Sequence, residues 1–191
     1  DDFIVGAPFD DNNGDNSGSA RLFSGANGSI LITFNGNSAH DNFGHSVSGA
    51  GDINNDGFDD VIVGALADDV NGADSGSARA FSGATFGILY TRNGDAAGDR
   101  FGRSVSGAGD VNNDGYDDFI VGAYQDDNNG SDSGSARVFS GADGSIIFTR
   151  NGDSAGDLFG DSVSGAGDVN NDGFDDFIVG APNDDNNGAN S

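Results

Sequence analysis

The sequence predicts an all-β fold in which a unit of four short antiparallel strands is repeated. Three observations predict it. Residues 49–60 return almost unchanged as residues 107–118 and 165–176, 58 residues apart each time, and a fixed long period is typical of repeat architectures. Each period contains short β-branched and aromatic runs separated by glycine and Asn-Gly turns, which indicate strands and hairpins. No stretch has the apolar spacing of an amphipathic helix.

Each complete period is expected to hold four strands. They fall at about 43–50, 60–65, 77–82 and 87–92 in one copy and at about 101–108, 118–123, 135–140 and 145–150 in the next. The first strand consists mainly of Gly, Ser and Ala, which suits a crowded inner position where neighbouring units converge. The third strand carries Phe81 or Phe139, with Phe23 in the incomplete first copy, and we expect these rings to pack between units.

The loop between the first and second strands has oxygen-bearing side chains at every second position. A glycine follows the third of them, and a further Asp closes the loop at its ninth position. The side chains are Asp52, Asn54, Asp56 and Asp60, then Asp110, Asn112, Asp114 and Asp118, then Asp168, Asn170, Asp172 and Asp176; the seventh positions, with a backbone carbonyl as donor, are Phe58, Tyr116 and Phe174. Calcium takes six to eight such oxygen ligands. The sequence therefore predicts three Ca²⁺ sites.

The EF-hand loop shares the first half of this spacing but requires a bidentate Glu at its twelfth position between two helices. Here the twelfth positions are Val63, Val121 and Val179, inside the β-branched runs that follow each loop. The EF-hand interpretation therefore fails, and the loop joins two strands.

The residues around the loop carry a resemblance to a known family. Phe43-Gly44 precedes the first loop and Gly64-Ala65 follows it, and the same pairs recur at residues 101–102 and 122–123 and at 159–160 and 180–181. This pattern resembles the FG-GAP repeat, which occurs in the β-propeller of integrin α-subunits and in bacterial surface proteins. The resemblance implies propeller-type blades of four strands, with calcium between the first and second strands, and an extracellular module for adhesion.

A second acidic cluster begins at Asp10, Asp68, Asp126 and Asp184 in the next hairpin of each repeat. Asp, Asn and Gly favour turns by themselves, so we expect a hydrated turn, with a weaker cation site as the alternative. Arg21, Arg79 and Arg137 recur in Gly-Ser-Ala-Arg and are expected to form structural ion pairs. His45, Arg103 and Asp161 occupy equivalent positions, and their different charges predict an exposed site under little constraint.

Composition limits the classes of partner. The formal net charge is −25, all 32 acidic residues are Asp, and the seven basic residues are scattered arginines. Phosphate binding draws on clustered Lys and Arg, so no nucleic acid partner and no membrane insertion is expected. There is no Cys, so disulfides are excluded. No signal peptide or membrane span is visible, while weak calcium sites favour an extracellular or cell-surface location.

We interpret residues 1–191 as a single repeat region, with a partial blade at 1–34, blades at 43–92 and 101–150, and a partial blade at 159–191. Residues 1–17 and 175–191 match at 15 of 17 positions, which leads us to expect a longer parent array or self-association through unpaired strand edges. The carboxylates are copied with the scaffold, whereas catalysis needs an asymmetric site, so no enzyme activity is expected. A module that binds a protein or glycan is favoured; a purely structural stalk or filament and an accessory module of an extracellular hydrolase are the alternatives.

Overall fold

The computed structural model describes residues 1–185 and contains β-strands and no helix in that range. The strands are β1 (Phe3–Ala7), β2 (Ser19–Phe23), β3 (Ile30–Asn35), β4 (Phe43–Gly51), β5 (Asp60–Ala65), β6 (Ser77–Phe81), β7 (Ile88–Asn93), β8 (Ser104–Gly109), β9 (Asp118–Ala123), β10 (Ser135–Phe139), β11 (Ile146–Asn151), β12 (Ser162–Gly167) and β13 (Asp176–Gly180). The predicted all-β class is confirmed.

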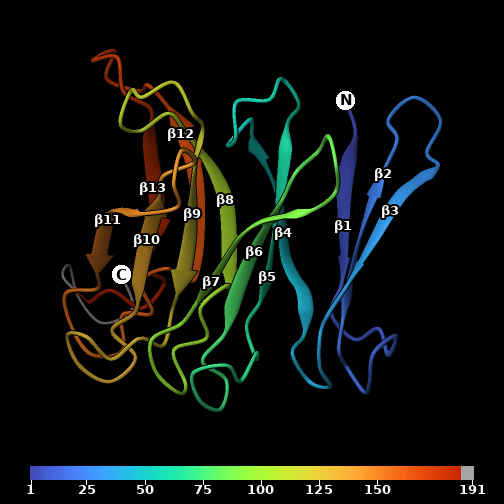
Figure 1. Cartoon of the computed structure of the whole chain (residues 1–191). Helices are drawn as coiled ribbons and strands as arrows, with labels where there is room; N and C mark the ends of the chain where they lie inside the picture. The colour runs from blue at the N-terminus through green and yellow to red at the C-terminus, as the bar shows by residue number, and fades with distance from the viewer. Residues whose placement is uncertain (186–191) are drawn as a thin grey trace.

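The strands form four antiparallel sheets, each a meander of consecutive strands. Their orders are β1-β2-β3, β4-β5-β6-β7, β11-β10-β9-β8 and β12-β13. The sheets stand side by side in sequence order, with the first and last at opposite ends of the row (Figure 1). The two complete sheets are the predicted four-stranded blades.

The first strands of successive blades lie against one another. β8 contacts β4 on one side and β12 on the other. The approach is close: a Cβ added at Gly107 would lie 3.1 Å from the backbone of Ala50, and one at Gly165 would lie 2.7 Å from the carbonyl oxygen of Gly107. Small residues dominate these strands because larger side chains would separate the blades. The strand predicted at 101–108 begins later than expected: Phe101 makes only an isolated bridge to Gly76, and β8 begins at Ser104.

Aromatic rings at Phe81 and Phe139 lie between blades, as predicted, whereas Phe23 stacks on Phe3 of its own sheet. Phe81 on β6 packs on Phe34 of the preceding sheet, with ring centroids 4.2 Å apart. Phe139 stacks on Phe119 at 5.3 Å, and Arg92 from the preceding blade lies over the Phe139 ring. The β5 and β9 strands are buried along their whole length, because each is central in its sheet and covered by a neighbouring blade.

One residue of the middle repeat differs from its counterparts and leaves a buried oxygen without a hydrogen bond. Asn12 Nδ2 donates to Asn35 Oδ1 at 2.9 Å, and Asn128 Nδ2 donates to Asn151 Oδ1 at 3.4 Å. In the middle repeat Val70 stands in place of the donor. Within residues 1–185, Asn93 Oδ1 is the buried side-chain atom left without a hydrogen-bond partner.

Val70→Asn is therefore expected to raise the free energy of unfolding by about 1 kcal/mol, because it supplies the missing donor. Val70 is 61% exposed, so little apolar burial is lost. For a chain of this length the midpoint of thermal unfolding should rise by about 2–4 °C. Asn128→Val is the matched control and should lower the midpoint; no change in either variant would contradict the explanation.

Candidate metal centres

The three acidic loops share one backbone conformation. Their fourth positions, Asn55, Asn113 and Asn171, have φ of 54°, 56° and 61°, and their glycines, Gly57, Gly115 and Gly173, have φ of 89°, 91° and 92°. Asn and Gly adopt this left-handed region most readily. The Asn-Asp-Gly sequence is thus what allows each loop to turn tightly enough to gather its side chains.

Within each loop, side-chain oxygens accept hydrogen bonds from the loop's own amides. In the first loop Asp52 accepts from the N–H groups of Asp56 and Gly57 at 2.9 and 2.8 Å. Asn54 Oδ1 also accepts from the Asp56 N–H, and Asp56 Oδ1 accepts from the Phe58 N–H. The Asp110 loop repeats all four bonds, and the Asp168 loop repeats the three that Asp168 and Asp172 accept. The bonds orient the oxygens at positions one, three and five in the first two loops, and those at positions one and five in the third.

In the first two loops the ninth-position carboxylate lies at the buried base of the loop, whereas Asp176 of the third loop is half-buried. Asp60 and Asp118 are 1% and 0% exposed. Asp60 accepts hydrogen bonds from the backbone N–H groups of Ile53 and Gly83, and Asp118 accepts from those of Val111 and Gly141. Burial raises the pKa of each to about 6, and these backbone bonds oppose the rise. The loop's other carboxylates, Asp52 and Asp56 for the first of them, raise the pKa further by repulsion.

The predicted ligands therefore come together in part. The first two loops bring their carboxylates near enough to repel one another, but nowhere in residues 1–185 do three Asp or His side chains converge as a ready metal cage. The donor set itself fits calcium: carboxylate and amide oxygens, with no sulfur or nitrogen ligand in the loop. Holding an ion would require the side chains at positions one, three, five and nine to draw together around it.

In the first three copies the second acidic hairpin is neither a hydrated turn nor a cation site at its first Asp, because that Asp pairs with an arginine. Asp68 and Asp126 are buried, and the Arg79 and Arg137 guanidinium groups pair with them at 3.4 Å. The hydroxyls of Ser77 and Ser135 donate to the same carboxylates. Sequence reasoning treated the acidic and arginine motifs separately, whereas the hairpin folds one onto the other; Asn186–Gly188 of the last copy lies outside the described residues.

Asp10 and Arg21 form the same pair at 3.0 Å in a more exposed setting, with 42% of the Arg21 side chain accessible. The predicted structural role of these arginines is confirmed. Two of them also bind across blades: Arg79 donates to Asn37 Oδ1 at 3.0 Å, and Arg137 to Asp95 Oδ2 at 2.6 Å.

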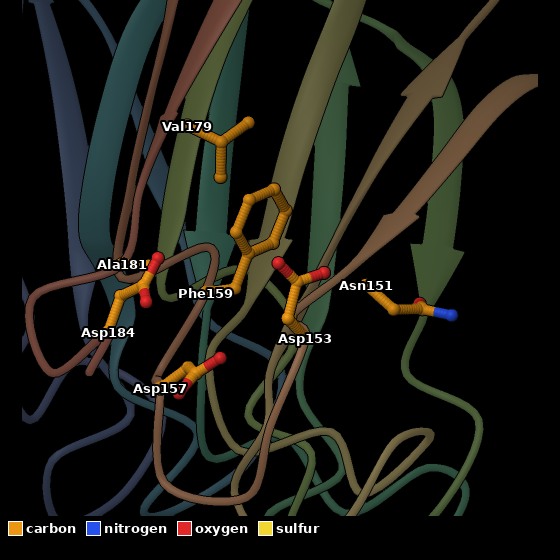
Figure 2. A pocket seen from close by; sticks show the side chains of 8 residues that line it. Asn151, Asp153, Asp157, Phe159, Val179, Ala181 and Asp184 are labelled. Atoms are coloured by element: carbon orange, nitrogen blue, oxygen red, sulfur yellow. The ribbon is translucent and has the colours of Figure 1, made fainter. Parts of the chain in front are cut away.

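A cavity of about 360 Å³ lies beside β13. The residues that line it are equivalent, one repeat later, to those around the Arg137 ion pair. Figure 2 shows Phe159 and Val179 there, with the carboxylates of Asp153, Asp157 and Asp184 around them. In the preceding repeat the equivalent residues surround Arg137, whose guanidinium lies 5.7 Å from the centre of the Phe101 ring. The cavity therefore lies at the position that the third-strand arginine occupies in the preceding repeat.

The equivalent residues His45, Arg103 and Asp161 correct another prediction. They are not independent exposed positions: Arg103 Nε donates to Asp161 Oδ1 at 3.0 Å, and Arg103 Nη1 lies 2.7 Å from His45 Nε2. Burial and the Arg103 charge lower the pKa of His45. Because Arg has only donors, the imidazole is neutral and accepts at Nε2. The three side chains differ in a way that lets them bind one another, because the repeat places each residue against its counterpart in the next blade.

A family model for the FG-GAP repeat matches residues 43–81, 101–139 and 159–191. Each match spans a first strand, an acidic loop and the strand after it, the same elements that build the blades described above. The chain belongs to the FG-GAP repeat family. A search of curated proteins found no match.

The structure gives each of the two motifs that flank the loop, Phe-Gly and Gly-Ala, a physical role. The Phe of each Phe-Gly pair is a core ring, with Phe43 and Phe101 fully buried beneath the Arg79 and Arg137 side chains. The Gly of the first two Gly-Ala pairs gives space to the next blade, because a Cβ at Gly64 or Gly122 would run into the carbonyl oxygen of Gly102 or Gly160. FG-GAP repeats are typical of extracellular proteins, and no helix able to cross a bilayer occurs in residues 1–185.

Proposed function

We propose that this FG-GAP module binds three calcium ions, one in each loop. The observation that carries the proposal is one loop conformation repeated three times. In the first two loops it orients oxygen side chains at positions one, three and five above a buried carboxylate, and in the third it orients those at positions one and five. The ligands would be the side chains at positions one, three, five and nine, with the carbonyl of Phe58, Tyr116 or Phe174.

Calcium would serve the fold at these positions. Two carboxylates about 4 Å apart repel by roughly 4 kcal/mol at an effective dielectric constant near 20, and each loop would have to bring three of them around the ion. The burial of Asp60 and Asp118 adds to that cost. A divalent cation offsets both terms, and it would clamp the first strand of each blade to the second.

The setting we propose is extracellular, where free calcium reaches the millimolar range that weak oxygen-ligand sites require. The module would serve adhesion by binding a protein or a glycan. The strongly acidic charge supports partners other than nucleic acid, and the copied carboxylates support a non-catalytic role. A structural array is the second candidate, and the His45–Arg103–Asp161 contact favours it, because there the differences between repeats are used to join blades.

Calorimetric titration of the calcium-free protein is expected to give three ions per chain. Asp114→Ala removes the fifth-position ligand of the middle loop and should reduce the number to two. Asp15→Ala is the control: Asp15 is exposed and lies in the second hairpin, so the variant loses the same charge and should still bind three. A titration without heat, repeated with a luminescent lanthanide and again without binding, would overturn the proposal.

A further inference from the structure

The eighth residue of the acidic loop, which is no calcium ligand in the proposed set, reaches the loop of the preceding blade. Asp117 Oδ2 accepts a hydrogen bond from the Asp52 N–H at 2.8 Å, and Asp175 Oδ2 accepts one from the Asp110 N–H at 2.9 Å. Both bonds join residues 65 positions apart. A further bond links the first two loops, from Asn55 Nδ2 to the carbonyl of Gly115 at 3.3 Å.

The residue before each donating amide is a glycine whose conformation and small size allow this contact. Gly51 and Gly109 have φ of 73° and 71°, and a Cβ at either would run into the carboxylate of Asp117 or Asp175. Glycine is thus required twice over, for the backbone conformation and for the space that the incoming carboxylate occupies. At Gly167, where no following loop lies within the described residues, a Cβ would meet no atom within 4 Å.

We propose that Asp117 and Asp175 are positioning residues that couple calcium binding in adjacent loops. The inference rests on the proposed function. Asp117 lies between Tyr116 and Asp118, which are ligands of its own loop in that proposal, and its carboxylate holds the amide of Asp52, the first ligand of the preceding loop. An ion in the Asp110 loop fixes both neighbours of Asp117 and thereby the carboxylate. The first ligand of the Asp52 loop is then pre-organised for its own ion.

Coupling of this kind is reciprocal, so each ion strengthens binding of the other by the same factor. Asp175 links the Asp168 and Asp110 loops in the same way. Calcium should therefore bind the row of blades with positive cooperativity.

The test uses the full chain with Asp172→Ala, which disables the last loop and leaves two coupled sites. This background should bind two ions with a Hill coefficient above 1. Adding Asp117→Ala should bring the coefficient to 1 and weaken the overall affinity at least fivefold, the lower end of typical coupling factors. Asp117→Asn retains an oxygen acceptor and should keep part of the cooperativity. Asp59→Ala removes the same charge from the same loop position, where the side chain is exposed, and should change neither quantity.

A second measurement does not depend on bound calcium. In chelator, hydrogen exchange at the Asp52 amide should be faster in Asp117→Ala than in the wild type or in Asp59→Ala. Three independent sites in the wild type, with equal exchange at Asp52 in all variants, would overturn the coupling and leave calcium binding intact. A wild type that binds no calcium would overturn the proposed function and the coupling together.

Discussion

Arg137→Ala is expected to lower the free energy of unfolding by about 3–5 kcal/mol, the usual cost of removing one partner of a buried ion pair. The Arg137 and Asp126 side chains are only 7% and 6% exposed, so the variant would leave the Asp126 carboxylate charged and enclosed. It would also remove the contact with Asp95 of the preceding blade and uncover the Phe101 ring. Urea unfolding followed by circular dichroism measures the loss.

The repeat supplies the control for this experiment. Arg21→Ala removes the same residue from the same strand position, but there the pair is exposed, and an exposed pair contributes about 0–1 kcal/mol. The double variant Asp126→Asn with Arg137→Met replaces the charged pair by neutral groups and should recover part of the loss. Equal losses for Arg21→Ala and Arg137→Ala would show that burial of the pair does not set its contribution.

Removal of calcium is expected to lower the midpoint of thermal unfolding by roughly 15 °C or more. At a free concentration one hundred times the dissociation constant, an ion that binds only the folded state contributes about 2.7 kcal/mol, and the proposed function places three such ions on the chain. Each kcal/mol corresponds to about 2–4 °C for a protein of this size. Differential scanning calorimetry in calcium and in excess chelator measures the difference.

A variant with Asp56→Ala, Asp114→Ala and Asp172→Ala is the control for that comparison. It lacks the fifth-position ligand of every loop, so its midpoint should be the same with calcium and with chelator. Since it also carries less repulsion, it should unfold at a higher temperature than the calcium-free wild type. Identical curves for the wild type in the two solutions would contradict a stabilising role for calcium.

Much of the fold could be predicted because its causes are local. Strand positions follow from β-branched runs between glycines, and β5, β6, β9 and β10 lie within one or two residues of the predicted ranges. The tight loop follows from Asn55, which tolerates the left-handed backbone, and from Gly57, which has no Cβ to oppose it. The calcium ligands remain a prediction, because the oxygens are oriented by loop amides but do not close into a cage on their own.

The sequence by itself determined the class, the 58-residue unit, the blades and the oxygen-rich loops, since these depend on backbone propensity and on neighbours within a few residues. The tertiary structure alone decided how deeply Asp126 is buried against Arg137 within a blade. It also decided the contacts between blades: the contact of Arg103 with His45 and Asp161, and the bond from the Asp52 amide to Asp117. The last two join residues 58 and 65 positions apart. No local pattern encodes such a pair, because each partner has a structural reason only once the blades have stacked and brought equivalent positions face to face.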